Sequence, residues 1–141
     1  MVVSTAQQAA EFLRERGVVG VLVGTAALKM YGYAVEAPDL DFLVDGPIPP
    51  LALALGVVEN VADADGTYAY PDVLFDGMKA QFIATRDRGH GEFFHPERAV
   101  EINGVLVAAV KDVIGLKRWR GRDKDREFLR GWDAWANREV K

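Results

Sequence analysis

Two short segments with strand character lie close together in the first third of the chain, and they constrain the fold more than any other feature. Residues 18–23 form an apolar, β-branched run, which predicts a buried strand. From Asp39 to Val44, apolar and polar side chains largely alternate, which predicts a second strand with one apolar face. Residues 26–31, between them, have helical spacing. A strand, a short helix and a strand in this order favour an α/β protein.

The rest of the chain predicts further helices and strands around this unit. Ser4–Gln7 has the pattern of a capping box, which would begin a helix that Gly17 ends. Further elements are predicted at Pro50–Leu55 (short helix), 73–84 (a hairpin turning at Asp76-Gly77), 105–107 (strand), and 110–119 and 123–137 (helices). We therefore expect a single domain over residues 1–141, with a mixed β-sheet flanked by helices and a C-terminal helical pair.

Composition excludes several classes of protein. The chain has 141 residues, half of them hydrophobic, which fits one globular domain. It has no cysteine, which rules out disulfides, cysteine-bound zinc and a cysteine nucleophile, and fits a cytoplasmic location. We expect no signal peptide and no membrane partner, because the N-terminus and the apolar runs lack those patterns. The net charge of −4 argues against a surface that broadly coats nucleic acid.

The first candidate site combines a strand-to-helix junction with paired carboxylates. Gly24 lets the backbone approach a ligand closely, Thr25 adds a hydroxyl, and a helix start can hold a phosphate. Asp39 and Asp41 project from the same strand face, where two carboxylates repel each other unless a cation lies between them. Mg²⁺ is commonly held by one or two carboxylates with substrate phosphates. The alternatives are that Gly24 and Thr25 form an ordinary turn and that Asp39 and Asp41 are a solvated pair without a metal.

A second candidate is a local basic run, Lys117, Arg118, Arg120, Arg122, Lys124 and Arg126. On one continuous helix, Lys117, Arg120 and Lys124 would share a face that binds phosphates or nucleic acid. The alternative is a solvated face paired with neighbouring acidic residues such as Asp123 and Asp125. Trp119, Trp132 and Trp135 follow near-helical spacing, which indicates either anchors for the last helices or a partner surface.

The segment Val21–Val44 resembles the signature of the polymerase-beta-like nucleotidyltransferase superfamily. That signature is a strand, Gly-Gly or Gly-Ser, a short helix, and Asp-x-Asp on the next strand. Within the superfamily, the chain is most similar to small bacterial proteins related to the AbiEii toxin group. These often carry a helical lysine followed by a basic stretch and a Lys-Asp pair, as residues 117–125 do here. The resemblance implies a nucleotidyltransferase-like fold, a nucleoside triphosphate ligand, and Mg²⁺ or Mn²⁺ as cofactor.

The resemblance also implies roles for individual residues. Asp39 and Asp41 would be the catalytic, metal-binding pair, Gly24 and Thr25 would contact phosphates, and Lys117 would lie near them. Thr25 replaces the usual Gly or Ser, and residues 35–38 lack the Arg and Thr that often precede Asp-x-Asp.

The place of a third carboxylate, on the strand at residues 79–83, is taken by Gln81. Gln81 would still belong to the nucleotide site, but an amide cannot deprotonate an acceptor hydroxyl.

Three functional hypotheses follow from these residues. The first is a metal-dependent nucleotidyltransferase that moves a nucleoside monophosphate to a hydroxyl on RNA, protein or a small molecule. The second is a catalytically degenerate relative that binds a nucleotide, RNA or a protein, in a toxin–antitoxin-like pair for example; Gln81 motivates it. A third alternative is scaffolding through the tryptophan-bearing C-terminal helices.

Overall fold

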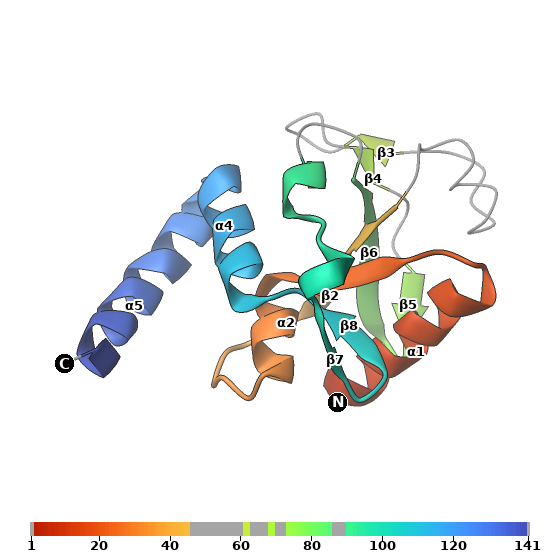
Figure 1. Cartoon of the computed structure of the whole chain (residues 1–141), viewed down its shortest axis with the longest axis horizontal. Helices are drawn as coiled ribbons and strands as arrows, with labels where there is room; N and C mark the ends of the chain where they lie inside the picture. The colour runs from red at the N-terminus through yellow and green to blue at the C-terminus, as the bar shows by residue number, and fades with distance from the viewer. Residues whose placement is uncertain (1, 46–60, 63–67, 70–72, 86–89, 141) are drawn as a thin grey trace.

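The computed structural model describes residues 2–45, 61–62, 68–69, 73–85 and 90–140 (Figure 1). The helix predicted at Pro50–Leu55 lies outside these residues. The helical elements are α1 (Val2–Glu15), α2 (Gly24–Met30), α4 (Val110–Arg120) and α5 (Asp123–Val140), with short 3₁₀ turns η1 (His90–Phe93) and η2 (Pro96–Arg98). None of the helices in this part of the chain is long and apolar enough to span a membrane.

The described strands form one mixed sheet. They are β1 (Gly20–Val23), β2 (Asp39–Val44), β3 (Val61–Ala62), β4 (Tyr68–Ala69), β5 (Val73–Phe75), β6 (Met78–Ala84), β7 (Val100–Ile102) and β8 (Val105–Val107). Their order is β3-β4-β6-β2-β1-β8-β7, and β5 also pairs with β6. At the centre, β2 runs antiparallel to β1 and parallel to β6, while β1 runs parallel to β8. The predicted mixed α/β architecture is confirmed.

Helix α1 covers one face of the central strands. Leu40, Phe42 and Phe82 are fully buried there, and Phe12 of α1 stacks on Phe82 with ring centroids 5.8 Å apart. The approach is closest at Gly20, where a Cβ atom would lie only 2.4 Å from Leu13 Cδ1. Any larger residue at position 20 would therefore force the Leu13 side chain to move.

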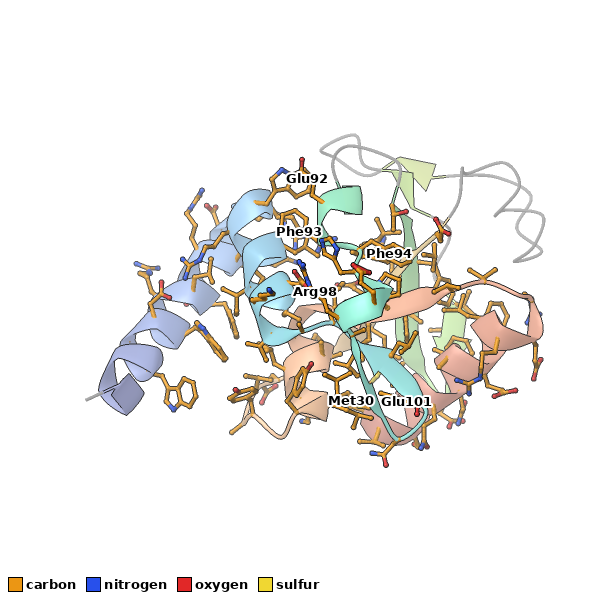
Figure 2. All side chains as sticks on the ribbon, in the orientation of Figure 1. Met30, Glu92, Phe93, Phe94, Arg98 and Glu101 are labelled. Atoms are coloured by element: carbon orange, nitrogen blue, oxygen red, sulfur yellow. The ribbon has the colours of Figure 1, made fainter. Side chains whose placement is uncertain are left out.

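The C-terminal helices stack beside α2, with α4 next to it and α5 outermost (Figure 1). Helix α4 ends because Gly121 adopts a left-handed conformation with φ 59°. A half-buried ion pair holds the start of α4 in place: Arg98, labelled in Figure 2, donates from Nε to Asp112 Oδ2 over 2.8 Å. Asp112 is 5% exposed, so this pair fixes η2 against α4.

Local sequence patterns predicted some of the strands and turns correctly but misplaced the start of one helix. The strand at Asp39–Val44 is confirmed at both ends, and the predicted hairpin turns at Asp76 and Gly77 with φ 51° and 80°. The capping box is wrong. Helix α1 begins at Val2, so Ser4 lies inside it, and Gln7 donates to the Asn103 carbonyl instead of reaching back.

Candidate functional site

The acidic pair opens β2 on the face opposite α1. Asp41 is paired with Val23 of β1 on one side and with Gln81 of β6 on the other, and Asp39 is paired with Lys79. Directly opposed residues of neighbouring strands project from the same face, so Asp41 and Gln81 lie side by side. The family resemblance implied this strand position for Gln81, and the register places its side chain next to that of Asp41. Asp39 is exposed, whereas Asp41 is only partly exposed.

Gly24 lies against the Asp41 carboxylate. Its φ of 73° is in the left-handed region, and a Cβ atom there would be 3.3 Å from Asp41 Oδ2. A side chain at this position would be strained and would also crowd the carboxylate. Thr25 follows in the first turn of α2, where it is partly exposed, and Val23 has no polar side chain to cap the helix start. The structure thus brings Gly24, Thr25 and Asp41 together, as the motif pair predicts.

The surroundings of Asp41 oppose its ionisation. Burial is the main cause and raises the pKa of the Asp41 carboxyl above its ordinary value; the like charge of Asp39 adds to the rise. The positive charges of Arg120, Arg122 and Lys124 act in the opposite direction without cancelling it. Asp41 is therefore close enough to the basic residues around the α4–α5 junction to interact with their charges, and an additional cation beside it would favour the ionised form.

Lys117 is held at this junction by a buried carboxylate. Its ammonium lies 3.9 Å from Asp125 Oδ1 and 4.6 Å from the centroid of the Phe128 ring. Burial lowers the pKa of the Lys117 ammonium, while the negative charges of Asp125 and Asp41 work against this. Since the charge of Asp41 acts on Lys117, these two residues of the predicted site lie close enough to interact electrostatically.

Asp125 organises the junction. It is 1% exposed and accepts hydrogen bonds from Arg122 Nε at 2.7 Å and from the Arg122 backbone N–H at 3.3 Å. Burial alone would raise the pKa of the Asp125 carboxyl, but Arg122 and Lys117 outweigh it and hold that pKa below its ordinary value. The sequence-based expectation paired Asp125 with the basic run as part of a solvated face; in the structure this carboxylate is buried.

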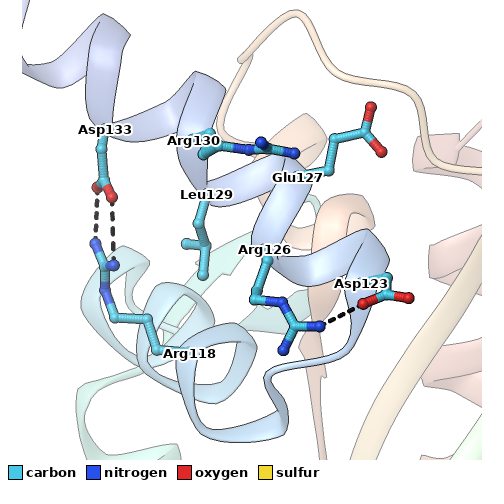
Figure 3. A pocket seen from close by; sticks show the side chains of 7 residues that line it. All are labelled: Arg118, Asp123, Arg126, Glu127, Leu129, Arg130 and Asp133. Carbon is cyan, nitrogen blue, oxygen red and sulfur yellow. Dashed lines mark hydrogen bonds and ion pairs between the residues drawn. The ribbon is translucent and has the colours of Figure 1, made fainter.

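The remaining basic residues divide into separate groups, because Gly121 breaks the helix. Lys124 lies in α5 and does not continue the α4 face of Lys117 and Arg120. A charged groove of about 560 Å³ lies between α4 and α5 (Figure 3). In it, Arg118 pairs with Asp133 at 2.7 Å, and Arg126 pairs with Asp123. These pairs agree with the alternative that this part of the basic run is a solvated face paired with acidic residues.

A second groove, of about 550 Å³, lies between α5 and the segment that joins α2 to β2. We call it the aromatic groove; its principal side chains are Tyr33, Glu127, Phe128, Trp132 and Trp135. Sequence reasoning identified the tryptophans as anchors or a surface but did not select Tyr33. Trp119 lies elsewhere, against Phe93 with ring centroids 5.7 Å apart.

The residues at the acidic pair fit a divalent cation in part. Two carboxylates on one strand face supply the oxygen ligands that Mg²⁺ prefers. Within the described ranges, no cluster of three or more His, Cys, Asp or Glu side chains is placed to hold a metal. The other ligands would therefore be the Gln81 amide, water or substrate phosphates. His95 donates from Nε2 to the Glu92 carbonyl at 2.7 Å.

Comparisons with protein families, curated proteins and solved structures gave no match to this chain. The geometry of the site is therefore the basis for the functional assignment.

Proposed function

We propose that this chain is a nucleotidyltransferase-fold domain that binds a nucleoside triphosphate together with Mg²⁺ or Mn²⁺ and transfers a nucleoside monophosphate to a hydroxyl acceptor. One observation carries the proposal: the Asp41 carboxylate lies against Gly24 and is also within electrostatic reach of Arg120, Arg122 and Lys124 around the α4–α5 junction. Carboxylates suit a divalent cation, and lysine and arginine side chains suit phosphates. The order β1, α2, β2, with the acidic pair opening β2, supports the same fold family.

Each group has a distinct role in this proposal. Asp39 and Asp41 hold the cation, which supplies positive charge to the phosphate oxygens when bound. Lys117 and Arg120 offset charge on the departing pyrophosphate. The acceptor oxygen bonds to the α-phosphorus while the bond from that phosphorus to the bridging oxygen of the β-phosphate breaks. The hydroxyl proton passes to a carboxylate of the pair or to water, because the Gln81 amide is not a base.

A second candidate is a binding module that holds the nucleotide without transferring it. The observation that favours it is the pairing of Gln81 with Asp41, since a neutral amide stands where a third carboxylate would complete the site. Such a module would act through RNA or a protein partner, in a toxin–antitoxin-like pair for example. The transferase and a module that binds a nucleotide require the same metal-dependent nucleotide site, whereas a module that binds only RNA or a protein does not.

Calorimetric titration with ATP, GTP, CTP and UTP, with and without Mg²⁺ or Mn²⁺, tests the shared site. We expect metal-dependent binding in the wild type and its loss in Asp41→Asn. Asp45→Asn is the matched control, because it removes the same charge just beyond the other end of β2. Unchanged binding in Asp41→Asn would refute the site.

The Gln81→Asp variant separates the two candidates. For the transferase, wild type releases pyrophosphate and transfers label from an α-labelled nucleotide to RNA or protein. For the binding module, wild type binds without releasing pyrophosphate, and Gln81→Asp raises the metal affinity. Failure of Gln81→Asp to raise that affinity would count against the binding module.

A further inference from the structure

The aromatic groove is built from rings that are held in place by one another. Tyr33 packs edge-to-face on Trp132 and Trp135, with centroids 5.2 and 5.6 Å apart, and the two tryptophans lie 5.2 Å apart. Trp135 nevertheless remains 38% exposed. The groove therefore presents a rigid aromatic wall with accessible indole surface, and the volume is in the range of small-molecule sites.

One contact joins this groove to the cationic junction. Phe128 lines the groove, and its ring also lies beneath the Lys117 ammonium at 4.6 Å. The next ring along α5 is Trp132, with its centroid 6.1 Å from that of Phe128. On the opposite wall, the segment that carries Tyr33 leads directly into Asp39 and β2. A ligand that fits both places has an anionic part and a planar aromatic part.

We propose that the aromatic groove binds the base of the nucleoside triphosphate whose phosphates lie at the α4–α5 junction. This inference rests on the proposed function and adds the base-binding part of the site. Stacking of a base on aromatic side chains tolerates any base, because every base has a π face. Glu127 at the groove adds a preference: an ionised carboxylate only accepts hydrogen bonds, so bases with an amino group bind more tightly than uracil.

Tryptophan fluorescence tests the inference in a Trp119→Phe protein, whose remaining tryptophans both line the groove. The probes are ATP, UTP and inorganic tripolyphosphate, each with Mg²⁺. We expect ATP to quench the fluorescence and to bind more tightly than UTP. Tripolyphosphate is expected to bind, by calorimetry, without quenching. This measurement changes no residue of the groove, so it does not depend on how well a groove variant folds.

Affinity measurements on Trp135→Ala, with Trp119→Ala as the matched control, complete the test. Loss of one stacking partner lowers the affinity for ATP about 10-fold and leaves that for tripolyphosphate unchanged. If tripolyphosphate binds and ATP neither quenches nor loses affinity in Trp135→Ala, the base does not use the groove, while the proposed function stands. If neither ligand binds the wild type, both the inference and the proposed function are overturned.

Discussion

The two faces of β2 differ in chemistry although their residues come from the same short strand. Leu40, Phe42 and Val44 on one face are fully buried, with α1 packed over that side of the sheet. On the other face, Asp41 is placed where burial and a like charge oppose its ionisation. The first face contributes to folding free energy, whereas the second retains a carboxylate that opposes it. A partly buried carboxylate that lowers the stability of the fold in this way indicates a functional site.

The largest expected effect comes from breaking the apolar face. Phe42→Ala leaves a cavity beside Phe82, whose ring centroid lies 5.9 Å away, and should lower the free energy of unfolding by about 3–5 kcal/mol. Urea denaturation measures the change. Leu74→Ala is the control: Leu74 is 64% exposed, so truncating this apolar side chain should change stability by less than about 0.5 kcal/mol. Equal effects of the two variants would contradict the assignment of the core.

The next effect concerns the cationic residues that face Asp41. Asp125→Ala removes a fully buried carboxylate and leaves Lys117, with a side chain only 12% exposed, without this counter-charge. Breaking a buried ion pair in this way should reduce the free energy of unfolding by about 3 kcal/mol. In the folded protein it should strengthen tripolyphosphate binding, because a negative charge beside Lys117 and Arg122 is lost. Asp123→Ala, which removes a carboxylate with a 96% exposed side chain, should change either property little. A stable Asp125→Ala protein with unaltered tripolyphosphate affinity would show that the junction does not bind phosphates.

The smallest effect is a gain in stability from the acidic face. The folded pKa of Asp41 lies above its unfolded value of about 3.9, so ionisation at neutral pH destabilises the folded state. Asp41→Asn should therefore melt at a higher temperature than wild type at pH 7 without metal. The gain should grow as the pH rises from the unfolded pKa towards the folded pKa of Asp41, and it should vanish below a pH of about 3.9. Thermal melts across this range, with Asp45→Asn as control, measure it; destabilisation by Asp41→Asn at neutral pH would contradict it.

Sequence patterns predicted the centre of the sheet because strand alternation is local. The bounds of β2 follow from a period of two residues, whereas the pairing of Gln81 with Asp41 is a contact between strands that the period does not determine. Strand β7 was missed, although Asn103-Gly104, with φ 51° and 81°, is a typical hairpin turn before β8. The start of α1 was misplaced because Val2 is buried in the core, and that packing outweighs the capping pattern at Ser4.

Local sequence patterns predicted only those residues of the candidate site that are close in sequence, whereas Gln81 and Lys117 were placed in it by the family resemblance. The motif pair supplied Gly24, Thr25, Asp39 and Asp41. The contact of Lys117 with Asp125 depends on how α5 folds back after the left-handed Gly121. The aromatic groove depends on α5 meeting the segment around Tyr33, which is a tertiary arrangement that spacing alone does not encode.

The central position of β1 has a consequence for how the chain is made. One edge of β1 pairs with β2, which follows soon after it, but the other edge pairs with β8 at residues 105–107. During synthesis, the ribosome therefore releases an apolar strand whose second partner does not yet exist. An unpaired strand edge of this kind recruits other chains. Nascent chains that stop before Val107 should consequently aggregate or require chaperones. Pairing with β8 therefore protects the exposed edge of β1 from aggregation.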